Sequence, residues 1–206
     1  MGLLRVSVDH LVRVPATSAR VHARVRGSSL VATGVAGRKA AEVRDLVAAL
    51  AARGISEDAV DVAGVRLTTT DGRLLHSQSV EIELVVAADP DMLPDVLGVL
   101  ADRPGVAVES LEWVYDEFEA SITAAAEAMR KARRKADAIA AAAGLEVTGI
   151  ANASDSWSMP QPQVEMADSS MLYSARASSA PLDLGVEINT STVLSTHLSV
   201  DFELSP

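Results

Sequence analysis

The stretch from Asp116 to Gly144 constrains the fold most, because it has the pattern of one long helix. Asp116 suits the capping position, and Glu119, three residues on, completes a pair like a capping box. Gly144 is a residue at which such a helix readily ends. Apolar residues recur between them at alternating spacings of four and three, which places them on one predicted stripe: Phe118, Ile122, Ala125, Met129, Ala132, Ala136, Ile139 and Ala143.

Half of this stripe is alanine, so whatever covers it can approach the helix axis closely. Burial in the chain's own core is the commoner arrangement, and we favour it. A seam between two subunits is the alternative. The two differ in their response to dilution, because only a subunit seam depends on protein concentration.

The same helix carries a basic cluster of five cations within six residues: Arg130, Lys131, Arg133, Arg134 and Lys135. The pairs Glu127–Lys131 and Arg133–Asp137 have the spacing of four that stabilises a helix, by only ~0.2–0.5 kcal/mol each. Charge runs of this kind are usually solvated helix faces, which is the favoured interpretation. The alternative is a docking surface for an acidic protein partner or another polyanion.

Composition excludes several classes of protein. The 206 residues carry a net charge of −10, which argues against general binding to nucleic acid or to an anionic membrane. The chain contains no cysteine, so it has no disulfide, thiol nucleophile or cysteine-based metal site. A chain of this length buries a sizeable core without such cross-links.

The start of the sequence has no targeting pattern. Leu3 and Leu4 are followed at once by Arg5, so no apolar core of a signal peptide forms. No run approaches the roughly 18 apolar residues that a membrane-spanning helix needs. We therefore expect a soluble, cytoplasmic protein without a membrane span.

Residues 20–115 contain patterns in the order strand, helix, strand, strand, helix, strand. This is the order of a ferredoxin-like β-α-β-β-α-β unit, with a largely antiparallel sheet and two helices on one face. Residues 60–70 and 78–87 flank an Asp71-Gly72 hairpin signal. The predicted class is thus α/β in the wider sense of α+β, with a mixed, largely antiparallel sheet.

A first strand at residues 4–14, the long helix, and strands at residues 145–153, 186–192 and 198–204 are expected to extend this sheet. The last two are interpreted as separate strands or as one long bent strand. The whole chain, residues 1–206, is predicted to form a single domain, with the helix, a mobile arm and the C-terminal strands in residues 116–206. Within the predicted sheet, the strand at residues 20–26 has a very basic face that we interpret as a solvent-facing sheet edge.

Residues 154–184 show no periodicity and contain several serines and prolines. A loop of this length is unusual in a compact domain. It is either a surface loop without fixed structure or an arm that becomes ordered on a neighbouring subunit. Apolar side chains that such an arm would bury, and that join the basic cluster as candidate interface residues, are Trp157, Met159, Met166, Met171 and Tyr173.

The sequence contains no recognisable motif for catalysis, cofactor binding or metal binding. The four histidines are isolated, without a second ligand at metal-site spacing: His10, His22, His76 and His197. His10 falls on the apolar face of its strand, which is typical of a core or interface histidine. Residues 34–39 lack the spacing of a phosphate-binding loop, and no nucleophile motif is present. We predict no cofactor and no enzyme activity.

Four loose motifs follow one another along nearly the whole sequence: VSVDHLVRVPATSARVHARV, LVAALAARGISEDAVDVAGVRLTT, ARRKADAIAAAAGLEVTGIANAS and PLDLGVEINTSTVLSTHLSVDFEL. In their order and spacing they resemble the SIMPL-domain family, a bacterial domain of unknown function. The resemblance implies a mixed α/β fold and self-assembly into rings or channel-like oligomers. Members of the family are often exported and linked to envelope or oxidative-stress phenotypes, and no catalytic residues are established for them.

Three functional hypotheses follow. The first is a non-enzymatic SIMPL-like protein that forms a homo-oligomer with a stress-related role. The second is a small-molecule or anion-sensing module, by analogy with other ferredoxin-like units. The third is a hydrolase that assembles carboxylates with His22, His76 or His197, and it has the least support.

Overall fold

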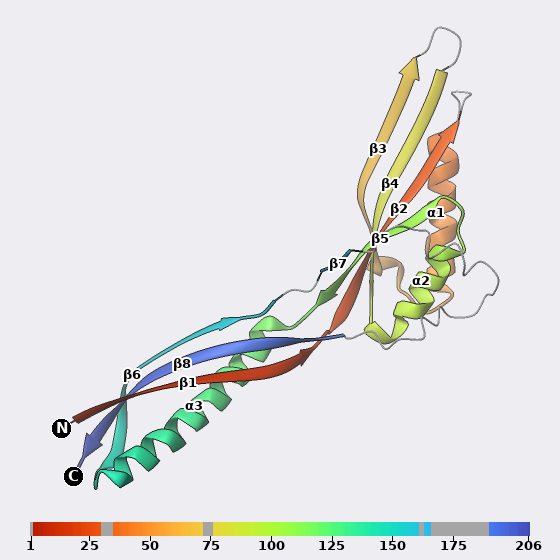
Figure 1. The fold of residues 1–206 in the computed structure, drawn as a ribbon. Coiled ribbons are helices and arrows are strands. Elements are labelled where there is room, and N and C mark those ends of the chain that lie inside the picture. The colour runs from red at the N-terminus through yellow and green to blue at the C-terminus, as the bar shows by residue number, and fades with distance from the viewer. Residues whose placement is uncertain (1, 30–34, 72–75, 161–162, 166–189) are drawn as a thin grey trace. The chain divides into compact units, whose positions relative to one another are not determined.

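The structure is a computed structural model that describes residues 2–29, 35–71, 76–160, 163–165 and 190–206. The chain forms two compact units (Figure 1). Unit 1 contains the described residues of Met1–Ala16, Tyr115–Gln161 and Thr190–Pro206. Unit 2 contains those of Thr17–Val114 and Pro162–Asn189. Helices and antiparallel sheets together confirm the predicted α+β class.

Unit 1 is a three-stranded sheet with one long helix. Its strands pair antiparallel in the order β1-β8-β6. Figure 1 shows the helix lying alongside the strands, and it packs mainly on β8 and β1. The elements are β1 (Gly2–Pro15), α3 (Glu117–Ala142), β6 (Glu146–Ser158) and β8 (Ser191–Ser205).

The structure confirms the predicted start and end of α3. The backbone N–H of Glu119 donates to Asp116 Oδ1 over 3.2 Å, which satisfies one of the free donors of the first turn. At the other end Gly144 has φ of +71°, a conformation that costs glycine little. The Leu145 N–H then bonds back to the Ala140 carbonyl over 2.9 Å, and the chain enters β6.

The buried stripe of α3 differs from the predicted one. Phe118 is 69% exposed, and Ile122 and Ile139 are also exposed, so their predicted burial is wrong. Residues spaced by four form a ridge inclined to the helix axis, and such a ridge can follow a twisted sheet. The small side chains of one such ridge, together with Ser121 beside it, let α3 lie close to the sheet: Ala124, Ala128, Ala132, Ala136 and Ala140.

The core of unit 1 lies between this alanine ridge and alternate residues of β8. Period-two alternation turns Leu198, Val200 and Phe202 toward the helix. Val6 of β1 packs with them, and Ala128, Ala132 and Ala136 of α3 lie on the helix side of the cluster. The ridge of buried alanines is therefore covered within one chain.

Unit 2 is a sheet in the order β3-β4-β2-β5-β7, with every neighbouring pair antiparallel. Helix α1 packs on β2 and β4, and α2 packs on β5 and β4. The elements are β2 (Ser18–Ser29), α1 (Val35–Ala51), a 3-10 turn (Glu57–Ala59), β3 (Val60–Asp71), β4 (His76–Ala88), a second 3-10 turn (Pro90–Met92), α2 (Leu93–Ala101), β5 (Val106–Val114) and β7 (Gln163–Glu165). The ferredoxin-like description remains a prediction from the order of these elements.

Two expectations about the sheets are wrong. The first strand and the C-terminal residues do not extend the sheet of unit 2, because β1 and β6 both pair with β8 instead. The strand at residues 20–26 is not an edge, because β2 lies between β4 and β5.

The predicted arm from residue 154 is also partly wrong. Residues 154–158 continue β6, because β8 is long enough to pair with them, and residues 163–165 form β7. Three of the predicted arm residues, Met166, Met171 and Tyr173, lie outside the described residues.

Candidate functional site

The open face of the unit 2 sheet carries paired charges. Alternation along β2 buries Val21, Ala23 and Val25 against the helices and turns Arg24 and Arg26 to the other face. Arg24 Nε lies 2.7 Å from Glu81 Oε1 of β4 and 2.9 Å from Glu109 Oε1 of β5. The predicted basic face is therefore neutralised by carboxylates from both neighbouring strands.

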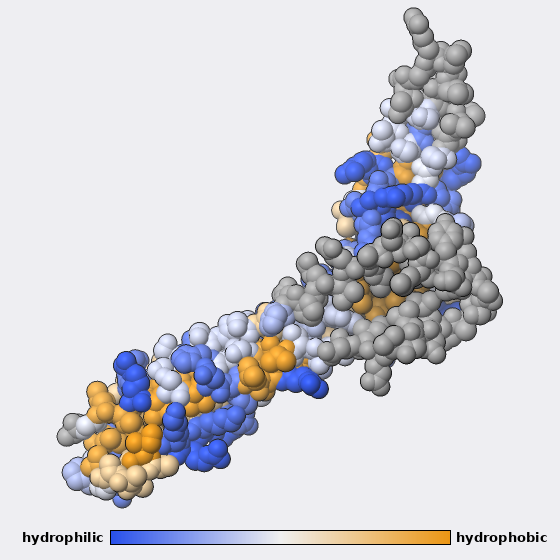
Figure 2. All heavy atoms as spheres, viewed as in Figure 1, coloured by the Kyte–Doolittle hydropathy of each residue, from blue (hydrophilic) through white to orange (hydrophobic). Residues whose placement is uncertain are grey.

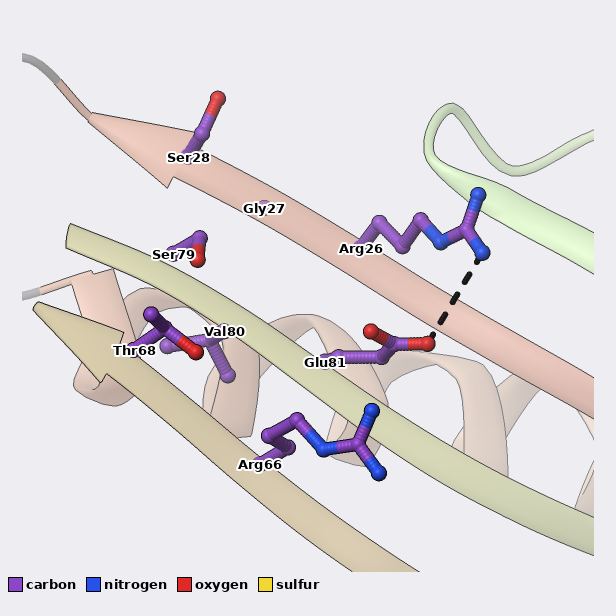
Figure 3. A pocket seen from close by; sticks show the side chains of 8 residues that line it. All are labelled: Arg26, Gly27, Ser28, Arg66, Thr68, Ser79, Val80 and Glu81. Atoms are coloured by element: carbon purple, nitrogen blue, oxygen red, sulfur yellow. Dashed lines mark ion pairs between the residues drawn. The ribbon is translucent and has the colours of Figure 1, made fainter. Parts of the chain in front are cut away.

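A shallow pocket of about 320 Å³ lies at one end of this face (Figure 3). Figure 3 shows the guanidinium groups of Arg26 and Arg66 on either side of Glu81, and Arg26 Nη2 lies 3.8 Å from Glu81 Oε1. Arg66 of β3 makes no ion pair with any residue that the structure describes. The remaining lining residues are Gly27, Ser28, Thr68, Ser79 and Val80.

This pocket has the chemistry of a small anion site. Guanidinium groups and hydroxyls both donate hydrogen bonds to carboxylate or phosphate oxygens. Glu81 offsets one of the two positive charges, so Arg66 supplies the excess. Sequence reasoning missed this site, although the outward-facing alternation of Arg66 and Thr68 on β3 was a usable signal.

The basic cluster of α3 does not form one patch. Lys131 Nζ lies 2.9 Å from His10 Nδ1, and Lys135 Nζ donates to the Ser7 carbonyl over 3.3 Å, so both reach β1. Arg133 turns the other way and donates to the Val147 carbonyl of β6 over 3.1 Å. These side chains brace the helix against both edge strands of the sheet.

The ion pairs on α3 agree only in part with the predicted ones. Arg133 pairs with Asp137 over 2.9 Å as expected. Glu127 pairs with Arg130 rather than with Lys131, which is engaged by His10. The hydrogen bond from Arg130 lowers the pKa of the Glu127 carboxyl below its usual value.

Strand β6 carries two large exposed apolar side chains, Ile150 and Trp157. Trp157 pairs opposite Thr196 and Ile150 pairs opposite Phe202, so both side chains lie on the helix-covered face of the sheet. Both are nevertheless exposed, because α3 packs mainly on β8 and β1. Figure 2 shows hydrophobic residues at the surface of unit 1. The next predicted interface residue, Met159, is partly buried.

On the other face of the unit 1 sheet, Arg5 and Asp201 form a two-bond ion pair. Arg5 Nε and Nη2 lie 2.6 and 2.8 Å from the two carboxylate oxygens. The hydrogen bonds from Arg5 lower the pKa of the Asp201 carboxyl, and Asp201 in turn raises the pKa of Arg5. The pair joins β1 to the central strand β8.

The described histidines do not converge. His10 contacts Lys131, and His197 Nδ1 lies 2.7 Å from Asp9 Oδ1, both in unit 1. His22 lies in unit 2, 3.7 Å from Glu112. No group of three or more metal-ligating side chains occurs within the part of the chain that the structure describes.

Among the described helices, none is long and apolar enough to cross a membrane. The two helix-backed antiparallel sheets define a mixed α+β protein. The model of the SIMPL family, described as a protein of unknown function (DUF541), matches residues 4–202. The chain therefore belongs to the SIMPL family, which confirms the resemblance in the sequence. No curated protein matches the chain.

Proposed function

We propose that this SIMPL protein is not an enzyme but a self-assembling protein, which forms a ring- or channel-like homo-oligomer with a role in the stress response. The observation that supports the proposal best is the position of its exposed apolar side chains. Most of them lie on strands that pair on one side only within the described chain: Leu3 and Leu11 on β1, Val62, Val65 and Leu67 on β3, and Ile150 and Trp157 on β6.

Strand edges of this kind favour assembly. An edge strand presents unpaired backbone N–H and C=O groups to any chain that can add another strand. In unit 1, β1 and β6 lie at opposite edges of one sheet. Pairing of β1 in one subunit with β6 in the next would use two different surfaces, and a contact of that type closes into a ring when the rotation allows it.

The test is the solution mass by light scattering after size exclusion, at low and at high salt. We expect a defined mass that is a multiple of the 21.5 kDa chain. Dissociation at high salt would show that exposed charges contribute to the contact, because salt screens them. A monodisperse species of 21.5 kDa at micromolar concentration would contradict the proposal.

Anion binding is a second candidate, favoured by the excess positive charge of Arg66 in the unit 2 pocket. We expect inorganic phosphate to raise the melting temperature of the wild-type protein and of Arg13→Gln, a matched change of an exposed arginine in unit 1. The Arg66→Gln variant should lose this shift in melting temperature. A ligand stabilises the folded protein only when it binds, and the variant lacks the guanidinium group that would bind phosphate. Equal shifts in all three proteins, or none, would exclude the site.

A further inference from the structure

We propose that strand β3 of unit 2 pairs with β3 of a second copy of this chain, antiparallel and about a two-fold axis that passes between Ala63 and Gly64. The inference rests on the proposed self-assembly and names one of its contacts. The surface involved, here called the β3 edge, is residues 60–67. Within the described residues β3 pairs only with β4.

The β3 edge exposes apolar side chains that belong to a core face. Val62, Val65 and Leu67 pair opposite Leu84, Ile82 and Val80 of β4, which are all buried. The three β3 side chains are nevertheless 56%, 67% and 53% exposed, because α1 and α2 pack mainly on β2, β4 and β5. Three large apolar side chains in a row on one edge mark an interaction surface.

The opposite face of the β3 edge carries two opposite charges. Asp61 pairs opposite Val85 and Arg66 opposite Glu81, so both side chains lie on the open face of the sheet. Neither makes an ion pair with another residue of the described chain. Each is therefore available to a charge on a partner.

One register of two antiparallel β3 strands matches both faces. With Ala63 of each copy opposite Gly64 of the other, Asp61 lies opposite Arg66 and Val62 lies opposite Val65. Each of these pairs occurs twice, and the symmetry also places Val60 opposite Leu67. Cross-strand pairs of opposite charge and of apolar residues both stabilise a sheet.

An irregularity in β3 allows this register to place apolar pairs on one face of the sheet and charged pairs on the other. Ala63 is an extra residue between the partners of Leu84 and Glu83, so Val62 and Val65 share a face although they are three residues apart. A bulge normally protects an edge from pairing. Here the two bulges meet at the axis, where Gly64 has no side chain. A shift of one residue would place apolar side chains opposite charged ones, and a shift of two would separate Asp61 from Arg66.

The first test exchanges the charges. Asp61→Arg or Arg66→Asp alone places like charges opposite each other twice per dimer. We expect each to weaken self-association by about tenfold, since two cross-strand pairs change sign. The double variant Asp61→Arg/Arg66→Asp restores both pairs in reversed order and should recover the wild-type association, measured by sedimentation over a range of concentrations. Equal association in all four proteins would overturn the proposal.

The second test uses the absence of cysteine from the chain. Val62→Cys and Val65→Cys, mixed under oxidising conditions, should form a disulfide-linked dimer, because directly opposed residues lie within the roughly 4.4–6.8 Å between Cα atoms that a disulfide spans. Either variant alone should cross-link poorly, because the two copies of one residue would lie three positions apart, about 10 Å along the strand. Val62→Cys mixed with Val193→Cys, a half-exposed valine of unit 1, is the matched control.

The outcomes separate the two proposals. A multimeric mass without the Val62–Val65 cross-link would overturn the β3 contact and leave the self-assembly intact. A monomeric wild-type protein at every concentration would overturn both. A cross-link specific to the mixture, together with recovery by the charge exchange, would establish the contact and its register.

Discussion

Replacing Phe202 with alanine is expected to lower the free energy of unfolding of unit 1 by about 3–5 kcal/mol, the range typical of such changes in cores. Phe202 is fully buried in the cluster with Val6, Leu198 and Val200. The buried residues that α3 contributes to that cluster are alanines, whose methyl groups cannot move to fill the space. The measurement is urea unfolding followed by circular dichroism, which reports the long helix α3 of unit 1.

The matched control is Phe118→Ala, which removes the other of the two phenylalanines in the chain. Phe118 is mostly exposed, so we expect a change within about 0.5 kcal/mol. A large loss of stability in Phe118→Ala, or a small one in Phe202→Ala, would contradict the arrangement of α3 on its sheet.

Replacing Ala132 with leucine is expected to destabilise unit 1 by about 1–3 kcal/mol or more, because a larger side chain overpacks a closed interface. Ala132 is fully buried where the alanine ridge of α3 meets β8 and β1. The added carbon atoms would have to lift the helix from the sheet, and the contacts of neighbouring alanines would be lost with it. The same unfolding measurement detects the effect.

Ala138→Leu is the matched control for this change, because Ala138 lies on the exposed side of the same helix. Alanine and leucine both favour helices, so the difference should stay within about 0.5 kcal/mol. Similar stability of the two leucine variants would show that the ridge is not closely packed. A seam between subunits would instead make the cost of Ala132→Leu depend on protein concentration.

The local elements of this protein follow from its sequence. The cap at Asp116, the end of α3 at Gly144 and the strand on each side of the Asp71-Gly72 signal all depend on neighbouring residues alone. Period-two alternation likewise places Arg24 and Arg26 on one face of β2. Such patterns reflect the backbone conformation and the direction in which side chains point, and both are determined over a few neighbouring residues.

The candidate sites follow less well, because they combine distant strands. The pocket is lined by Arg26 of β2, Arg66 of β3 and Glu81 of β4. The alternation within each strand shows which side chains share a face, but it does not show which strands lie next to each other. The basic cluster is likewise one run of charges in the sequence. In the structure, however, Lys135 contacts Ser7 of β1 and Arg133 contacts Val147 of β6, so its side chains reach two different strands. The interface role of the cluster and of Trp157 and Met159 stays a prediction.

The sequence alone determines that this chain forms a long capped helix and alternating strands, and its motifs place it in the SIMPL family. Only the tertiary structure shows that β1, β6 and β8 form a sheet separate from that of unit 2. It also selects the ridge through Ala128 and Ala132 in place of a stripe through Phe118. The reason is that partner strands and helix orientation depend on twist and close packing between distant residues, which no local pattern encodes.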